Sequence, residues 1–178
     1  MTEADRAANV LGALALAVAD QLSASAGRAG VSDSAGAALS ALYHFLDRPT
    51  LEQLSRVLGL THSAVVRLVD RLASTGLITR GPGDDRRSRT ISLTPQGRDV
   101  ARTIEAVRAD ALNAAIAGFS AEELRQLHSL TGRVMANIVQ SKDGGAWICR
   151  LCDLEACDRA SGHCPTANAA AAKYGRPQ

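Results

Sequence analysis

The chain has 178 residues, of which 46% are hydrophobic but only 3% aromatic, and a formal net charge of +2. This length suits one domain with appendages, and a core of Leu, Val, Ile and Ala favours helices over a sheet-rich sandwich. The apolar run at residues 10–19 lacks a basic flank and is too short to span a membrane. We therefore expect a cytoplasmic protein with no membrane partner.

The positive charge is concentrated in the middle of the chain. Residues 48–102 carry ten Arg and five acidic residues, whereas the remainder carries ten basic and thirteen acidic residues. A basic centre within a neutral-to-acidic chain is typical of proteins that bind a polyanion.

Two helices are expected before this basic centre. Apolar residues recur at helical spacing over 4–25, and the glycines of 27–30 end that helix. Asp33 or Ser34 is positioned to cap a second helix that continues to about Leu46, before a proline ends it.

Two short helices around a glycine turn come next. Thr50 is expected to cap a helix over 51–58, Gly59 makes the turn, and Thr61 caps a helix that runs to about Ser74. This order is a helix-turn-helix pattern.

A hairpin and two longer helices complete the main body. The β-prone stretches 77–80 and 89–93 flank a turn-rich segment. A Thr-Pro pair then opens a helix over 95–117, and a capping box opens the last helix, over 120–140. The predicted fold class is mainly α, of the α+β winged-helix type: a winged helix-turn-helix with a two-strand wing, flanked by dimerisation helices.

The helix over 61–74 is the candidate reading element for duplex DNA. A helix fits the major groove, its N-terminal residues reach base edges, and its free amides favour a phosphate. The alternative is a solvated polar face, which applies most to the histidine and the second arginine. The candidate contact residues are Thr61, His62, Ser63, Arg67 and Arg71.

The hairpin tip supplies the second group of candidate DNA contacts. A narrow minor groove attracts Arg, and a neighbouring carboxylate can hold such an Arg extended. The alternative is an exposed loop whose ion pairs contribute little. The candidates at the tip are Asp85, Arg86, Arg87 and Arg89.

Residues 39–99 resemble the MarR family of winged helix-turn-helix regulators, and with the flanking helices the resemblance covers about 5–140. The order and spacing of the matching segments are more specific to this family than any single segment is. The segments that carry it are Leu51–Ser55, Ser63–Leu72, Gly76–Arg80, Asp85–Ser88 and Leu93–Gly97.

This resemblance implies a homodimer that binds a pseudopalindromic operator, usually as a repressor. It implies that the helix over 61–74 enters the major groove and that Arg87, braced by Asp85, enters the minor groove. Many relatives release DNA when a small molecule binds between the dimer and DNA-binding regions. Others respond to cysteine oxidation near the first helix, but this chain has no Cys before Cys149.

The Ala-rich helix faces also indicate a partner helix, and a two-fold dimer would match a palindromic site. We divide the chain into an N-terminal dimerisation helix (1–32), a winged helix-turn-helix DNA-binding domain (33–97), C-terminal dimerisation helices (98–142) and a Cys-rich metal-binding tail (143–178).

All four cysteines lie in that tail with the spacing C-x2-C-x4-C-x6-C. Four clustered thiols in a reduced compartment indicate a metal centre rather than structural disulfides. The alternative is a group of surface thiols or a reversible disulfide. The candidate ligands are Cys149, Cys152, Cys157 and Cys164.

The spacing favours an iron–sulfur cluster, because such clusters accept irregular Cys runs and the last Cys precedes a Pro. Zinc is the alternative, with His163 as a possible replacement ligand, although His163 is expected to be a loop residue. A cluster would sense redox state or iron; zinc would be structural and leave sensing to a small-molecule effector. Trp147 is expected to pack the tail onto the body, and the Ala-rich end of the chain to be partly frayed.

Two other functions remain open at this point. The Cys run also suits a small redox enzyme, although no phosphate loop, carboxylate pair or Cys–His nucleophile pattern accompanies it. A protein-interaction module that has lost DNA binding is the other alternative, against which the Arg-rich wing argues. We therefore expect a DNA-binding regulator and no enzyme.

Overall fold

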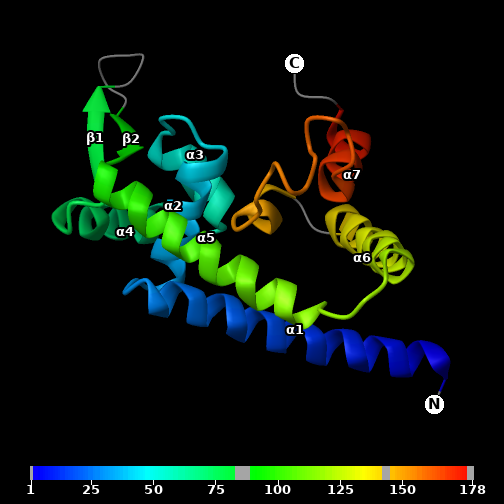
Figure 1. The fold of residues 1–178 in the computed structure, drawn as a ribbon. Coiled ribbons are helices and arrows are strands. Elements are labelled where there is room, and N and C mark those ends of the chain that lie inside the picture. Colours follow the sequence, from blue (N-terminus) through cyan, green and yellow to red (C-terminus); the bar gives the residue numbers. More distant parts are fainter. Residues whose placement is uncertain (1, 83–88, 142–144, 176–178) are drawn as a thin grey trace.

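A computed structural model describes residues 2–82, 89–141 and 145–175 of the chain. Its elements form a helical body with one two-stranded hairpin, followed by a separate helical tail (Figure 1). In chain order they are α1 (Glu3–Arg28), α2 (Asp33–His44), α3 (Leu51–Leu58), α4 (His62–Ser74), β1 (Ile78–Pro82), β2 (Arg89–Leu93), α5 (Pro95–Ala115), α6 (Ala121–Ser141), the 3-10 helix η1 (Gly145–Cys149) and α7 (Pro165–Tyr174).

The first helix is longer than predicted, 26 residues rather than 22. A capping box between Thr2 and Asp5 starts it, and it continues through Gly27 to Arg28, with Ser25 and Ala26 buried and Ala26 lying against Gly36 of α2. Its N-terminal part extends beyond the body, as Figure 1 shows.

Because of this length, α1 differs from the short apolar run expected from the sequence. It is the one helix in the described part of the chain that is long and apolar enough to cross a membrane, with a mean hydropathy of 1.4 over an 18-residue window that is 11% buried. Length and composition alone do not separate a membrane span from a helix whose apolar face a protein partner covers.

The second helix begins and ends earlier than predicted. Ser32 is its N-cap, in place of Asp33 or Ser34, and it ends at His44 rather than near Leu46. The Asp33 carboxylate instead accepts a hydrogen bond of 2.8 Å from the hydroxyl of Ser23 on α1, which ties the two helices together.

The core lies between α2, α3, α4, the hairpin and α5. Fully buried aliphatic side chains fill it, and burying each contributes about 2 kcal/mol of hydrophobic free energy. The residues at its centre are Leu39, Leu54, Val65, Val69, Ile91 and Ile104.

The hairpin is antiparallel, with Ile78 opposite Leu93 and Pro82 opposite Arg89. The first strand therefore starts and ends later than predicted, because pairing in this register continues through Pro82, which needs no amide donor at the last position. The hairpin packs against α4 and leads directly into α5 through the helix cap at Thr94.

The Ala-rich stretch that the sequence predicts to be partly frayed is helical over its described residues. It forms α7, which is capped by Cys164 and packs along α6 with Thr166 and Ala169 buried. These alanines form a helix because the neighbouring α6 covers them. Figure 1 shows α6 and α7 side by side, away from the body formed by α1 to α5.

Candidate DNA interface and thiol cluster

The start of α4 presents a hydrogen-bonding surface. Thr61 is the N-cap, and its hydroxyl oxygen accepts a hydrogen bond of 3.3 Å from the amide of Ala64. The hydroxyl of Ser63 lies 3.3 Å from that of Thr61. The remaining amides of the first turn have no partner within the helix, so they are available to a phosphate.

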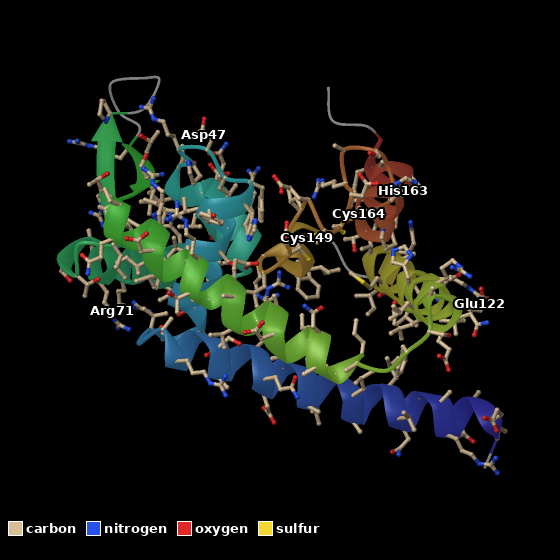
Figure 2. The ribbon with its side chains drawn as sticks, viewed as in Figure 1. Asp47, Arg71, Glu122, Cys149, His163 and Cys164 are labelled. Atoms are coloured by element: carbon tan, nitrogen blue, oxygen red, sulfur yellow. The ribbon has the colours of Figure 1, made fainter. Side chains whose placement is uncertain are left out.

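All five predicted contact residues of this element are exposed and lie away from the core. They alternate at helical spacing with the buried face formed by Val65, Leu68, Val69 and Leu72. In Figure 2, Arg71 points outward from α4, far from the labelled cysteines. The exposed set is Thr61, His62, Ser63, Arg67 and Arg71.

The hairpin stands next to α4 as the predicted wing. Arg89, the first residue of β2, is exposed. Asp85, Arg86 and Arg87 lie outside the described residues.

Two arginines that the sequence did not single out hold the wing in place. Arg48, which has a φ of 45°, donates a hydrogen bond of 3.0 Å to the carbonyl of Pro82 at the end of β1. Arg80 on β1 pairs with Asp70 on α4. The first contact joins residues 34 positions apart and the second residues ten positions apart, so neither follows a helical or strand spacing.

The tail places the four cysteines near one another, and we call them the thiol cluster (Cys149, Cys152, Cys157 and Cys164). Cys149 and Cys152 influence each other's ionisation, as do Cys157 and Cys164, and Cys149 also interacts electrostatically with Cys164. Cys149 and Cys164 are buried, and all four are free of disulfides.

The thiols of this cluster differ in acidity. The hydrogen bond from Cys149, together with the positive charges of Arg108 and Arg159, lowers the pKa of Cys152 to about 7. The same hydrogen bond, together with burial, raises the pKa of Cys149. Burial, followed by the hydrogen bond to the fourth thiol, raises the pKa of Cys157 to about 12. Cys152 is therefore the thiol most readily converted to a thiolate.

Four thiols are chemically suitable ligands for a metal, but their positions do not yet form a metal site. Among the described residues, no three His, Cys, Asp or Glu side chains already surround a common point that could hold a metal ion. His163 is largely exposed, and its Nδ1 lies 2.6 Å from Asp158, as expected for a loop residue. Figure 2 shows His163 next to Cys164 at the start of α7.

A polar network connects the tail to the body next to this cluster. Glu105 on α5 accepts hydrogen bonds of 2.8 Å from Ser40 and 3.0 Å from Arg108, and it lies 3.2 Å from His44. Burial opposes ionisation of Glu105, but the bonds from Arg108 and Ser40 hold the pKa of its carboxyl below the ordinary value. His44 also lies 4.0 Å from Asp153 in the tail.

Helices α3 and α4 around the Gly59 turn, together with the β1–β2 wing, define a winged helix-turn-helix protein. A sequence model of the MarR family matches residues 29–88, which span α2, α3, α4 and β1. The chain therefore carries a MarR family domain. The members of this family are transcription regulators and not enzymes, which removes the redox-enzyme alternative.

Solved structures agree with this fold. The MarR family transcription regulator SP03579 is 24% identical with a TM-score of 0.67, over 79% of this chain and 97% of that one. The transcriptional regulator PA3341 is 28% identical with a TM-score of 0.61, over 74% and 96%. A MepR mutant from S. aureus, bound to an oligodeoxyribonucleotide, is 19% identical with a TM-score of 0.55, over 74% and 96%.

The thiol cluster lies outside the residues that the family model matches. The family thus accounts for a DNA-binding regulator and leaves the tail to be explained by its own chemistry.

Proposed function

We propose that the protein is a cytoplasmic transcription repressor that binds a pseudopalindromic operator as a homodimer. The observation that carries this proposal is the exposed polar start of α4 beside the wing, on a MarR family domain. Helix α4 would enter the major groove with Ser63 and Arg67 near base edges, and the wing would approach the minor groove.

Exposed apolar helix faces support the homodimer. Large hydrophobic side chains that remain accessible in one chain lie on α1, around the α5–α6 turn and on α6, where a second copy would cover them. Because a dimer with two-fold symmetry presents two equal reading helices, it requires two inverted half-sites. These side chains include Val10, Leu14, Leu16, Ile116, Phe119 and Leu130.

An electrophoretic shift on the DNA upstream of its own gene tests operator binding. We expect a complex that weakens steeply as salt rises, because arginines displace counterions from phosphates. Arg87→Ala should weaken it on the order of tenfold or more, since one lost base or groove contact costs about 1–3 kcal/mol. Arg125→Ala, which removes an exposed arginine of α6, is the control and should bind as the wild type does. Equal binding by Arg87→Ala would contradict the proposed role of the wing.

We further propose that the thiol cluster holds an iron–sulfur cluster that senses iron or redox state. Four free cysteines, close together in the tail, supply the thiolate ligands that such clusters use. The irregular spacing of these cysteines, the last of which precedes a proline, favours an iron–sulfur cluster over a single zinc ion. When bound, such a centre supplies redox chemistry, while the chain supplies its ligands and shields Cys149 and Cys164 from solvent.

The second candidate is a structural zinc site combined with a small-molecule signal. A cavity of about 190 Å³ between α1, α2, α5 and the tail favours it, with Leu22, Ile104, Arg108 and Leu151 among its lining residues. This volume is below the roughly 300 Å³ at which ligand pockets begin, so only a small effector would fit without rearrangement.

Anaerobic purification followed by a visible spectrum and iron, sulfide and zinc analysis separates the two candidates. We expect a brown protein that contains iron and sulfide. Cys164→Ser should lose the iron, whereas His163→Ala should retain it, because that imidazole is exposed and engaged with Asp158. A colourless protein with about one zinc ion per chain would overturn the iron–sulfur proposal and favour the zinc alternative.

A further inference from the structure

The tail is attached to two separate parts of the molecule. Its first part, η1, lies against α3 of the helix-turn-helix. The contact is close at Gly59, in the turn between α3 and α4, where a Cβ atom would lie 3.7 Å from the Cβ of Trp147. Leu151 packs against the hydrophobic core a few residues further on. This confirms that Trp147 packs the tail onto the body.

Its last part, α7, is attached to α6. The Nζ of Lys173 donates hydrogen bonds of 3.0 and 2.9 Å to the carbonyls of Val139 and Gln140, at the C-terminal end of α6. The Gln140 amide in turn donates to the carbonyl of Ala169 on α7, at 3.2 Å. A positive charge at the end of a helix also interacts favourably with its dipole.

Within the part of the chain that the structure describes, α7 is the one helix or strand against which α6 packs extensively. Figure 1 shows the tail, in orange, running between the body and the α6–α7 pair. Within one chain, the tail is therefore the main non-covalent connection between the DNA-binding unit and α6.

The four cysteines of the thiol cluster are divided between the part of the tail on the body and the part attached to α6. Cys149 closes η1, and Cys152 follows Leu151, so both belong to the part that lies on the body. Cys164 is the N-cap of α7, where its sulfur accepts a hydrogen bond of 3.5 Å from the amide of Ala167, and Cys157 interacts electrostatically with it. A centre that binds all four sulfurs joins the two parts.

We propose that the thiol cluster is a removable cross-link between the DNA-binding unit and α6. When all four thiols bind one centre, the tail holds α4 at a set position relative to α6; when the centre is lost, that position is released. The inference rests on the proposed dimeric repressor, in which α6 contributes to the dimer and the two copies of α4 must match half-sites about 34 Å apart. The cross-linked form is the one that binds operator tightly, because a pre-positioned pair of reading helices has less freedom to lose on binding.

The distance between the two copies of α4 in the full-length dimer tests this cross-link. A spin-labelled unnatural amino acid at Ser74, an exposed position at the end of α4, gives one distance per dimer without using the cysteines. We expect a narrow distance distribution in the metal-loaded protein. It should become broad after chelation and in Cys149→Ser/Cys152→Ser, with operator affinity on the order of tenfold weaker. Glu155→Gln, an exposed tail position, is the control and should stay narrow.

A second pair of variants separates the cross-link from the metal site. Trp147→Ala and Lys173→Met keep all four thiols and should keep the metal content of the wild type, but each detaches one end of the tail. Both should broaden the α4–α4 distance and increase amide hydrogen exchange in η1 or α7. A narrow distribution in these variants, or in the chelated protein, would overturn the cross-link even if the metal is present. Failure of the wild type to shift DNA would instead overturn the repressor proposal and leave the distance measurement valid.

Discussion

Replacement of Gly97 by alanine is expected to destabilise the winged-helix unit by about 3 kcal/mol, the upper part of the usual range for overpacking. A Cβ at this position in the first turn of α5 would lie 1.9 Å from the carbonyl oxygen of Leu77. That oxygen cannot move away easily, because it also accepts hydrogen bonds from the amide and hydroxyl of Thr94. The substitution therefore pushes the start of α5 away from the hairpin.

Urea unfolding at a fixed protein concentration measures this effect, since the stability of a dimer depends on concentration. Gly27→Ala is the matched control: a methyl group there meets no atom within 4 Å, and the residue lies within helix α1. It should be neutral or stabilising by up to about 1 kcal/mol. A midpoint for Gly97→Ala equal to that of the wild type would show that α5 does not approach Leu77 this closely.

Replacement of Ser63 by glutamate is expected to weaken operator binding strongly without unfolding the protein. The side chain is exposed in the first turn of α4, where a negative charge stabilises a helix by about 0.3–1 kcal/mol. The same charge would face the phosphates that the N-terminus of α4 is proposed to approach. We expect operator affinity to fall on the order of a hundredfold, from one lost contact and the added repulsion.

Fluorescence anisotropy with a labelled operator measures the expected loss of affinity. Thermal unfolding of the same variant checks that its stability is retained. Ala121→Glu adds the same charge to the exposed first turn of α6 and should leave operator affinity within about twofold of the wild type, because one distant charge is largely screened. If Ser63→Glu bound operator as tightly as Ala121→Glu, α4 would not be the reading helix.

The two substitutions test different kinds of feature. The reading helix was predicted from the sequence, whereas the close contact of Gly97 with Leu77 was not. The threonine caps of α3, α4 and α5 were predicted, and each accepts the expected backbone hydrogen bond: Thr50 from Gln53, Thr61 from Ala64 and Thr94 from Gly97. A cap acts within three or four residues of chain, so residue types and spacing suffice to find it. The apolar face of α4 was predicted for the same reason, since helical periodicity is local.

Contacts between distant segments were not predictable in this way. Arg48 binds the carbonyl of Pro82, and Glu105 accepts a hydrogen bond from Ser40, only because the fold places α2 and the residues after it next to the wing and α5. Side-chain hydrogen bonds between such segments leave no spacing signal, because any exposed Arg or Glu has the same local pattern.

The tail combines both cases. The four cysteines and their spacing were evident from the chain alone, and so was a chemical role for them. Their division into a pair on the body and a pair at the start of α7 was not, because α7 is stable only where α6 covers its alanines. An isolated helix of ten residues is marginal in water, so propensity alone predicts fraying.

The sequence by itself determined the winged helix-turn-helix, its reading helix and the donor set of the tail, because periodicity, caps and residue chemistry act over short stretches. Only the tertiary structure decided the close approach of Gly97 to Leu77, the network around Glu105 and the attachment of the tail to both α3 and α6. These depend on which surfaces meet after folding, and burial and shape complementarity between distant elements decide that.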